Sequence, residues 1–341
     1  MIVGWGIVGI GRHADAYMAG AIRKAKNSRL VAVCSRDMSR AQAFSSKHGA
    51  QFAYDSYDKM LANKSVDAIY VASPNSQHRE HTELAAEAGK HVLCEKPMAT
   101  SVDDCASMIQ TCRRDGVKLG MGFHLRHHPL HLAAREIIRG GNAGRIAFVQ
   151  GQWAMGAWGK TQPGPRPELS KWWEDPSMSL AGSLVGMGVH IVDLFRFLLN
   201  DEFRSVTAFS HPEGEALDHL TAVVARFERG IVGSLVSGRV LPASRNEFTI
   251  YGSQARIGGL NTLGPKIDSK LQVVREGKEE VTTADQGDMY TDEISDFNQS
   301  IKADGAPRST GVDGLRANEV LEAVIQARAS GRLAEVNRRP P

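Results

Sequence analysis

The sequence lacks an excess of either charge. Its 41 lysines and arginines nearly balance its 38 aspartates and glutamates, which leaves a formal net charge of +3. Proteins that bind the nucleic-acid backbone normally carry a basic face or a long run of lysine and arginine. No such run occurs in this chain. The sequence therefore predicts no nucleic-acid partner.

Cysteine is also scarce. All four cysteines lie in the first third of the chain, at Cys34, Cys94, Cys105 and Cys112. None of them forms a C-x-x-C pair, and no matching pair of histidines accompanies them, so the spacing indicates neither a zinc knot nor a disulfide framework. We interpret them as buried thiols.

A long uninterrupted apolar run is absent. The most apolar stretch, residues 184–199, contains His190, Asp193 and Arg196, each of which is costly at the middle of a bilayer. A strand and a glycine turn begin within the first dozen residues, where a secretory signal would place a basic segment followed by an apolar one. We therefore expect no membrane contact and a cytoplasmic location.

The amino-acid composition is that of an ordinary globular protein, with 42% hydrophobic and 23% charged residues. At roughly 150 residues per domain, a chain of this length predicts two domains. Residues 1–123 alternate short apolar runs with helical patterns, which is typical of βαβ units on a parallel sheet. Residues 124–341 change to longer alternating strands and end in two helices. We predict an α/β N-terminal domain of the Rossmann type and a C-terminal α+β domain.

Three hairpins are predicted in the second domain. Each consists of two alternating runs separated by a short turn that contains glycine, a pattern typical of antiparallel pairing. The paired runs are 223–227 with 231–236, 247–251 with 255–257, and 271–275 with 280–283. The second sheet is therefore predicted to be mostly antiparallel.

A glycine motif follows the first predicted strand. Residues 9–14 read Gly-Ile-Gly-Arg-His-Ala, which fits G-x-G-x-x-A between a strand and a helix, where a dinucleotide-binding fold requires it. The first glycine allows the tight turn, the second lets the pyrophosphate approach the backbone, and the helix offers free N–H groups to the phosphates. A purely structural turn is the alternative. We predict cofactor contacts from Gly9, Gly11, Arg12 and His13.

The end of the second predicted strand bears on the choice of cofactor. An NAD-dependent enzyme usually places an acidic residue there, on the ribose 2′-hydroxyl, but this chain has Ser35 and Arg36, with Arg40 four residues further on. A serine hydroxyl can bond a 2′-phosphate, and an arginine can pair with its charge or cover the adenine. We therefore prefer NADP(H). NAD(H) stays possible because Asp37 lies close by, and two solvated arginines at a helix start are the structural alternative.

Two further motifs carry a resemblance to a known family. Residues 72–78 read Ala-Ser-Pro-Asn-x-x-His, and residues 95–97 read Glu-Lys-Pro. With them the chain resembles, over nearly its whole length, the glucose-fructose oxidoreductase, inositol dehydrogenase and rhizopine-catabolism (Gfo/Idh/MocA) family. The resemblance implies a Rossmann domain joined to a domain with an open, mostly antiparallel sheet. It also implies interconversion of hydroxyl and carbonyl groups of sugars and related polyols with NAD(H) or NADP(H).

The family pattern also implies residue roles. It adds Ser73, Asn75, His78, Glu95 and Lys96 to the expected cofactor site. Within the family, the segment from His190 to Asn200 and the Ser35/Arg40 pattern most resemble the NADPH-dependent 1,5-anhydrofructose reductase branch.

The resemblance places Lys96 beside the nicotinamide ribose and the reacting substrate oxygen. A cation at that point stabilises the negative charge that develops during hydride transfer. The strand before it should end near Cys94, so Lys96 emerges at the carboxyl edge of the sheet, where open α/β folds bind their ligands. A surface lysine before a proline is the alternative.

His190 matches the acid/base histidine of the family. An imidazole that titrates near neutrality can protonate a carbonyl oxygen or accept a hydroxyl proton. Asp193 lies three residues on and is a candidate to orient the ring, although a lone histidine in an apolar segment is more often structural. We predict Lys96 and His190 as the catalytic residues.

Position 186 is the main departure from the family pattern. The family often has an aspartate four residues before the histidine, and this chain has Gly186. The change removes a carboxylate from the proton relay. His124, Arg126 and Asp193 are the candidates to replace it, and a reaction that depends less on a relay is the other explanation.

Four histidines lie within eight residues, at positions 124, 127, 128 and 131. Their spacing would suit two metal ligands on one helix, but Pro129 interrupts that helix and no carboxylate or thiolate completes a ligand shell nearby. We predict no metal. His124 and Arg126 are instead expected to face the substrate.

Four of the five tryptophans fall between residues 153 and 173, at Trp153, Trp158, Trp172 and Trp173. Flat indole rings pack on the C–H faces of sugars, so a carbohydrate platform that includes Trp172 is one interpretation. A subunit contact or a loop anchor is the other, because tryptophan is also enriched at protein interfaces.

Together these patterns predict an NADP(H)-dependent oxidoreductase that interconverts a hydroxyl and a carbonyl on a sugar or sugar derivative, with Lys96, His190, His124, Arg126, Trp172 and Asp193 around the substrate. Two alternatives stay open. One is a nucleotide-binding regulatory or scaffold protein without turnover, and the other is a dehydrogenase of a cyclitol or another non-sugar substrate. The family's open sheet commonly packs against a second subunit, so we expect a homodimer or homotetramer formed through the strands between residues 223 and 283.

Overall fold

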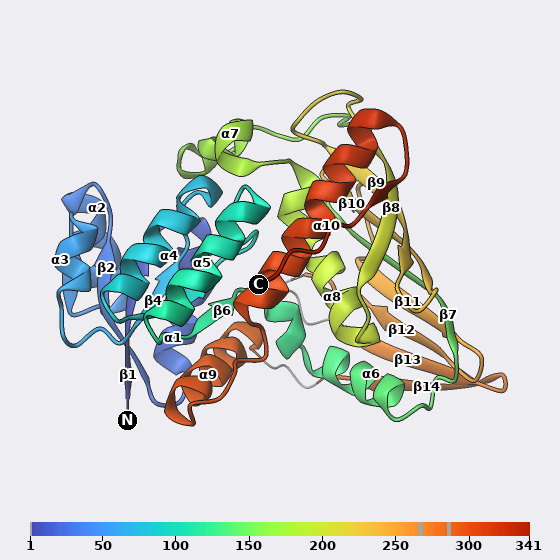
Figure 1. Ribbon diagram of the computed structural model, residues 1–341, viewed down its shortest axis with the longest axis horizontal. Coiled ribbons are helices and arrows are strands. Elements are labelled where there is room, and N and C mark those ends of the chain that lie inside the picture. Colours follow the sequence, from blue (N-terminus) through green and yellow to red (C-terminus); the bar gives the residue numbers. More distant parts are fainter. Residues whose placement is uncertain (1, 265–268, 285–287) are drawn as a thin grey trace.

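The structure is a computed structural model that describes residues 2–264, 269–284 and 288–341, and it contains two β-sheets (Figure 1). The N-terminal sheet has six strands in the order β3-β2-β1-β4-β5-β6, and every pair in it is parallel. This is the strand order of a doubly wound dinucleotide-binding fold. Its strands are β1 (Val3–Val8), β2 (Ser28–Cys34), β3 (Phe52–Tyr54), β4 (Ala68–Val71), β5 (His91–Cys94) and β6 (Leu119–Met121).

Helices connect these strands and cover the sheet, as the alternating pattern predicts. They are α1 (Ala19–Lys24), which the short π-helix η1 (Ala14–Met18) precedes, α2 (Met38–His48), α3 (Tyr57–Leu61), α4 (His78–Glu87), which the short helix η2 (Asn75–Gln77) precedes, and α5 (Val102–Arg114). Because all six strands run the same way, their carboxyl ends meet at one edge of the sheet. The N-terminal Rossmann fold is confirmed.

The second sheet has nine strands in the order β14-β13-β12-β11-β7-β10-β9-β8-β15. The three predicted hairpins are present as antiparallel pairs of β9 with β10, β11 with β12, and β13 with β14. One pair, β10 with β7, is parallel. The strands are β7 (Ile146–Ala154), β8 (Phe203–His211), β9 (Leu220–Phe227), β10 (Val232–Gly238), β11 (Glu247–Gly252), β12 (Arg256–Leu260), β13 (Lys270–Arg275), β14 (Lys278–Thr283) and β15 (Ala334–Glu335).

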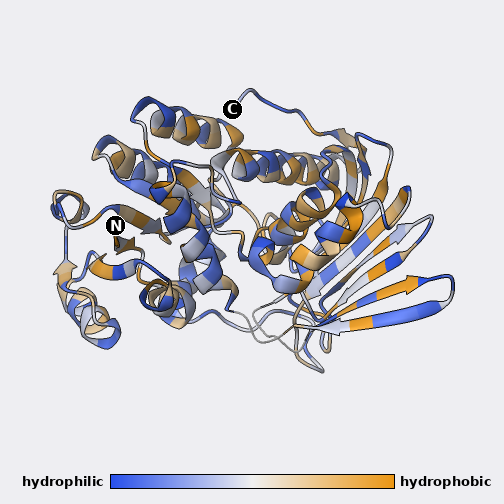
Figure 2. Ribbon diagram, turned by 90° about the horizontal axis from the view of Figure 1, so that it is seen from below, coloured by the Kyte–Doolittle hydropathy of each residue, from blue (hydrophilic) through white to orange (hydrophobic). Residues whose placement is uncertain are grey.

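Helices cover one face of the nine-stranded sheet and leave the other face open (Figures 1 and 2). The covering helices are α6 (Pro129–Arg139), α8 (Val189–Leu199) and α10 (Gly311–Ser330), which contact strands β12, β7 and β8 respectively. The short helix η3 (His124–His127) lies between the two sheets in sequence. Three further short helices lie between β7 and β8: η4 (Glu168–Glu174), α7 (Pro176–Ser179) and η5 (Leu184–Gly188). The predicted open, mostly antiparallel C-terminal sheet is confirmed.

The helical segment Pro176–Leu199 is long and apolar enough to cross a membrane by length and composition alone. However, 83% of its apolar window is buried inside the protein. Its apolar residues are therefore accounted for by the core that α8 forms with the sheet.

The two closing helices pack back onto the N-terminal domain. From α9 (Met289–Lys302), Asn298 accepts a hydrogen bond of 3.0 Å from the Trp5 indole nitrogen on β1. From α10, the Asn318 side chain donates to the Ala99 carbonyl at 2.7 Å and accepts from the Met98 backbone nitrogen at 3.2 Å. The predicted division after residue 123 separates the two sheets in sequence, but α9 and α10 join the domains in space.

Candidate active site

The turn after β1 requires its first glycine. Gly9 has φ +88°, and a Cβ atom at this position would lie 2.3 Å from the Ala72 carbonyl carbon and the Ser73 nitrogen. A side chain at Gly11 would meet nothing within 4 Å. Gly9 thus lets the end of β1 approach the backbone that follows β4, and Gly11 leaves open space in front of its own backbone. This is the arrangement that a pyrophosphate needs.

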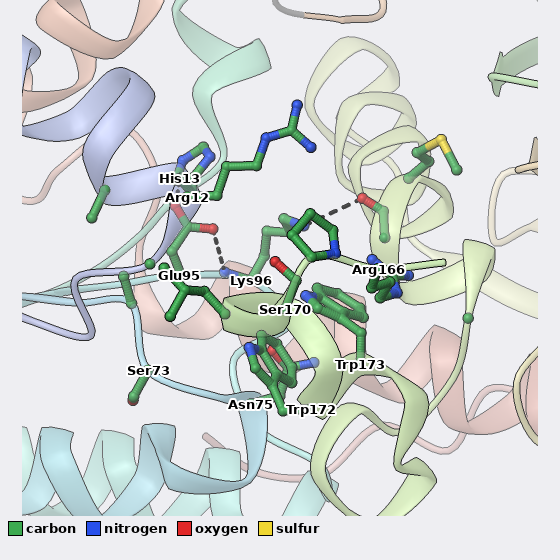
Figure 3. A pocket seen from close by; sticks show the side chains of 18 of the residues that line it. Arg12, His13, Ser73, Asn75, Glu95, Lys96, Arg166, Ser170, Trp172 and Trp173 are labelled. Atoms are coloured by element: carbon green, nitrogen blue, oxygen red, sulfur yellow. Dashed lines mark hydrogen bonds and ion pairs between the residues drawn. The ribbon is translucent and has the colours of Figure 1, made fainter. Parts of the chain in front are cut away.

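A cavity of about 450 Å³ opens at this edge of the parallel sheet, within the usual size range of ligand sites (Figure 3). Both domains line it. The sequence-predicted residues among its lining are Gly11, Arg12, His13, Ser73, Asn75, His78, Glu95, Lys96 and Trp172, together with Gly186. The structure therefore brings together most of the expected cofactor site and the position where the family carboxylate is missing.

Glu95 is buried and its oxygens are committed to neighbouring donors. The Tyr70 hydroxyl donates to Oε1 at 2.5 Å, the His13 Nε2 atom lies 3.2 Å from the same oxygen, and the Lys96 backbone nitrogen donates to Oε2 at 3.2 Å. Burial alone would raise the pKa of Glu95, but His13, Lys96 and the Tyr70 hydrogen bond hold that pKa well below its usual range. The result is a fixed anion that anchors the glycine turn to the end of β5.

Lys96 lies between Glu95 on one side and the Trp173 and Arg166 side chains on the other (Figure 3). Its ammonium donates to the Gly186 carbonyl at 3.3 Å and lies 5.8 Å from the centroid of the Trp173 ring. Burial lowers the pKa of Lys96 and the charge of Arg166 lowers it further, while Glu95 opposes the shift. The ammonium is thus a partly desolvated cation on the cavity wall.

The loop that carries Lys96 is held from two directions. The His78 ring lies between two backbone carbonyls, with Nδ1 2.9 Å from the Pro97 oxygen and Nε2 2.9 Å from the Ser73 oxygen. Asn318 holds the other side of the loop. His78 therefore lines the cavity while its ring nitrogens join two loops, which is a structural task rather than the predicted cofactor contact.

Two polar residues of the motif at 72–78 also have protein partners. The Asn75 side chain donates to the Ser179 carbonyl at 2.9 Å and so connects the N-terminal domain to α7. The Ser73 hydroxyl lies 2.8 Å from Nδ1 of His81. Both residues line the cavity, and the Asn75 bond also joins the two domains.

His190 lies behind the cavity wall. It is 3% exposed, its Nδ1 has no hydrogen-bond partner, and it is not among the residues that line the cavity. Burial lowers the pKa of His190 well below its ordinary value, and the nearby Lys96 charge adds to this. The imidazole is therefore neutral, and it lies near enough to Lys96 for that charge to act on its pKa. Its role as the acid/base residue stays a prediction.

His124 lies directly against His190. Their ring centroids are 4.8 Å apart, and the His124 Nε2 atom has no hydrogen-bond partner. Burial lowers the pKa of His124 to about 3. His124 does not line the cavity, so it contacts the predicted acid/base residue instead of the substrate space.

The structure corrects the expectation that Arg126 and Asp193 face the substrate and that Asp193 orients His190. Arg126 donates to both carboxylate oxygens of Asp193, with distances of 2.6 to 3.1 Å, and to Asp313 at 2.8 Å. Both residues are buried and neither lines the cavity. Because an unpaired buried charge is costly, the two side chains neutralise each other in the core. Of the three candidates to replace the missing carboxylate, His124 is the one that contacts His190.

Gly186 contributes open space. A Cβ atom at this position would meet nothing within 4 Å, and the residue lines the cavity next to the Lys96 ammonium. Packing therefore does not exclude an aspartate at Gly186. The space that a family carboxylate would occupy is part of this chain's cavity.

The other three histidines of the cluster each have a polar partner within the protein. His127 contacts the Arg308 guanidinium at 2.9 Å, His128 accepts from the Leu130 backbone nitrogen at 3.1 Å, and His131 lies 2.8 Å from the Leu125 carbonyl. Within residues 2–264, 269–284 and 288–341, no three histidine, cysteine or acidic side chains form a group that could hold a metal ion.

The four clustered tryptophans separate into three environments. Trp172 and Trp173 stack with centroids 4.6 Å apart and line the cavity, whereas Trp153 is buried against His190 and His124. Trp158 is 79% exposed. Only the pair on η4 is thus placed to contact a ligand in the cavity.

The predicted determinants of cofactor choice lie beside the cavity. Ser35 and Arg36 follow β2, whose Cys34 pairs with Val8 immediately before the glycine turn. The nearby carboxylate, Asp37, accepts hydrogen bonds from the backbone nitrogens of Ser39 and Arg40 and so caps α2. Its Oδ1 atom accepts both of these bonds at the helix start, while the Arg36 and Arg40 side chains are exposed.

Two arginines and a tryptophan are among the cavity residues that the sequence-based site does not contain. Arg166, Trp173 and Arg239 all line the cavity from the C-terminal domain. Arg166 stands between two prolines beside the tryptophan pair, and that placement was the one available signal. Arg239 follows β10, whose parallel pairing with β7 is a long-range feature that no local pattern indicates.

Two sequence models of one enzyme family match the chain. A model described as the oxidoreductase family with an NAD-binding Rossmann fold matches residues 3–123, and a model described as the GFO/IDH/MocA C-terminal domain matches residues 131–258. The chain is 29% identical to 1,5-anhydro-D-fructose reductase of Ensifer adhaerens over 335 residues, which are 97% of this chain and 98% of that protein. It is 26% identical to D-xylose 1-dehydrogenase (NADP(+)) 2 of Haloferax volcanii, across 92% of this chain and 94% of the other.

Solved structures give the same result for the fold. The aldose-aldose oxidoreductase of Caulobacter crescentus, solved in complex with glycerol, matches with a TM-score of 0.88 and 25% identity. The match covers 98% of this chain and 100% of that chain. The resemblance inferred from the motifs at residues 72–78 and 95–97 is confirmed.

Proposed function

We propose a function on the premise that the chain belongs to the Gfo/Idh/MocA family of oxidoreductases: it interconverts a hydroxyl and a carbonyl on a sugar or sugar derivative, with NADP(H) as the hydride carrier. That it is an oxidoreductase of this sugar-acting family follows from the matches above. The preference for NADP(H) and a substrate like 1,5-anhydrofructose are the proposed part. The observation that carries the proposal is the Lys96 ammonium on the cavity wall between the glycine turn and the tryptophan pair.

The residues around the turn fit a dinucleotide. Gly11 leaves open space in front of its backbone, and Arg12 lines the cavity beside it. Ser35, Arg36 and Arg40 would take the 2′-phosphate, because a hydroxyl and two cations suit its charge. The Oδ1 atom of the nearby Asp37 is occupied in capping α2. When bound, the nicotinamide supplies or accepts the hydride.

Lys96 and His190 divide the remaining chemistry. The Lys96 cation stabilises negative charge on the reacting oxygen and can exchange a proton with it. His190 is the neutral base behind Lys96, and His124 packs against its ring. Support for this assignment comes from the electrostatic coupling of His190 to Lys96 and from the absence of any hydrogen-bond partner on the His190 Nδ1 atom in the described part of the chain.

The function is tested by NADPH and NADH binding followed by turnover with ketoses, dicarbonyl sugars, anhydrosugars and polyols. Turnover of any carbohydrate supports the proposal, and 1,5-anhydrofructose is the probe for the branch. Tight cofactor binding with turnover only of cyclitols or amino-acid derivatives would instead favour a non-sugar dehydrogenase. Binding without any turnover would favour a regulatory or scaffold protein.

The cofactor preference is tested with Arg36→Glu. The change removes a positive charge and places a carboxylate where the 2′-phosphate is proposed to bind, so we expect the NADPH Kd to rise at least about tenfold, which is about 1.4 kcal/mol. The NADH Kd should change by less than about threefold, because NADH lacks that phosphate. Arg23→Glu makes the same charge change on the exposed side of α1 and serves as the control. Equal weakening of both cofactors by Arg36→Glu would contradict the assignment.

We also propose a homodimer or homotetramer through the open face of the nine-stranded sheet. That face exposes large apolar side chains on five strands: Phe209, Val224, Val232, Tyr251 and Val281. Exposed apolar surface of this kind marks interaction sites. Sedimentation at micromolar concentration should give two or four copies, and Val224→Glu should lower that number without unfolding the chain. A wild-type monomer would refute the proposal.

We also propose that the protein lies in the cytoplasm, since all four thiols are free and buried.

A further inference from the structure

The cavity carries more positive charge than the proposed reaction uses. Arg12, Lys96, Arg166 and Arg239 line it, and among the lining residues that the structure describes Glu95 is the one carboxylate. The Glu95 oxygens are already bonded to the N-terminal domain, Arg12 belongs to the glycine turn, and Lys96 faces the reacting oxygen. The two arginines of the C-terminal domain have no role in the proposed function.

Arg166 is held in place by its neighbours. Its guanidinium lies over the Trp173 ring, 5.0 Å from the centroid, and its backbone nitrogen donates to the Glu174 carboxylate at 3.3 Å. Burial, together with the charge of Arg239, lowers the pKa of Arg166 to about 10. The side chain therefore remains a cation, but one that is partly desolvated and repelled by its neighbour.

Arg239 reaches the cavity from the end of the nine-stranded sheet. It follows β10 directly, and its backbone nitrogen donates to the His219 carbonyl at 2.7 Å, so the end of the sheet fixes its position. Burial also lowers the pKa of Arg239. Glu174 offsets part of both charges, but within the described residues no carboxylate oxygen lies within 4.0 Å of either guanidinium.

Two half-buried guanidinium groups without a direct counter-ion are unfavourable in an empty protein, because each loses hydration and each repels the other. A bound anion lowers both costs, because it replaces the lost hydrogen bonds to water and its negative charge offsets the repulsion between the two cations. Guanidinium groups bind carboxylates and phosphates through paired, charge-assisted hydrogen bonds. The stacked Trp172 and Trp173 rings beside them suit the C–H face of a sugar.

We propose that Arg166 and Arg239 bind an anionic group on the substrate, so that the preferred substrate is an acidic sugar derivative, either a sugar acid or a sugar phosphate, and the neutral 1,5-anhydrofructose binds more weakly. This inference rests on the proposed function for the chemistry at the sugar hydroxyl. The phosphates of the cofactor are the other source of negative charge. Their proposed contacts come from the glycine turn and the end of β2, in the N-terminal domain, whereas both arginines belong to the C-terminal domain.

The test measures binding separately from turnover. Tryptophan fluorescence of the NADPH-loaded enzyme is followed during titration with D-glucose, D-gluconate, D-glucose 6-phosphate and inorganic phosphate. We expect at least one of the acidic sugars to bind at least tenfold more tightly than glucose, with the difference shrinking as salt is added. Arg239→Gln and Arg166→Gln should each raise that Kd at least tenfold and leave the NADPH Kd within twofold. Arg23→Gln, which makes the same change at an exposed position of α1 outside the cavity and the open sheet face, is the control.

The outcomes separate the two proposals. Turnover of neutral sugars without any preference for acidic ones would overturn this inference and leave the function standing. Weaker NADPH binding in the arginine variants would assign the pair to the cofactor and would also overturn it. Binding of acidic sugars that depends on both arginines, without turnover of any carbohydrate, would support the anion site and overturn the function. The two variants are independent, because Arg166 lies in a loop and Arg239 at a strand end. If one of them does not fold, the other still tests the proposal.

Discussion

Lys96→Met is expected to lower kcat/KM by about two to three orders of magnitude, since loss of a single group that stabilises charge in a transition state costs roughly 3–4 kcal/mol. Methionine has a similar length and no charge, so it removes the cation and keeps most of the packing. The Lys96 side chain makes one hydrogen bond, to the Gly186 carbonyl. The loop itself is held by His78 and Asn318. We therefore expect a folded protein that still binds NADPH, measured by its thermal unfolding and by fluorescence titration.

The pH dependence of the reaction provides a second readout of Lys96. Reduction needs the protonated ammonium, so kcat/KM should be constant at low pH and fall tenfold per pH unit above the pKa of Lys96. Burial lowers that pKa from its ordinary value of 10.5, which places the fall below pH 10.5. Lys96→Arg keeps a cation at all accessible pH values and should abolish the fall while keeping part of the activity. An unchanged pH profile in Lys96→Arg would assign the titration to another group.

Local patterns were sufficient for the parallel sheet, for the three hairpins and for the residues that act through backbone turns. The glycine turn at Gly9, the three hairpins and the loop at Lys96 are each encoded within a few residues, because a positive φ, a strand alternation or a short motif is a local property. For the same reason the N-terminal half of the candidate site could be predicted before the fold was known.

Contacts between distant segments could not be predicted in this way. Arg126 and Asp193 are 67 residues apart, and their pairing depends on how η3 packs against α8. The same holds for Arg239, which reaches the cavity because β10 pairs in parallel with β7. A polar residue in an apolar segment indicates either a site or a buried ion pair, and sequence alone does not supply the partner that distinguishes them.

Two glycine substitutions should separate folding from cofactor binding. Gly9→Ala forces a methyl group to within 2.3 Å of the backbone at Ala72 and Ser73, in a conformation with φ +88°. We expect the free energy of unfolding to fall by about 2–5 kcal/mol, from overpacking and from left-handed backbone strain. Both causes act in the empty protein, so the loss should be visible by denaturant titration without any nucleotide.

Gly11→Ala should behave in the opposite way. Its methyl group meets nothing within 4 Å, so the free energy of unfolding should stay within about 1 kcal/mol of the wild type. The same methyl group fills the space proposed for the pyrophosphate, and we expect the NADPH Kd to rise at least about 100-fold, which is about 2.7 kcal/mol. Gly20→Ala, in α1 and also free of neighbours within 4 Å, is the matched control and should leave the NADPH Kd unchanged. Normal NADPH binding by a stable Gly11→Ala variant would contradict the assignment of this turn to the cofactor, because the added methyl group would then not reach the bound pyrophosphate.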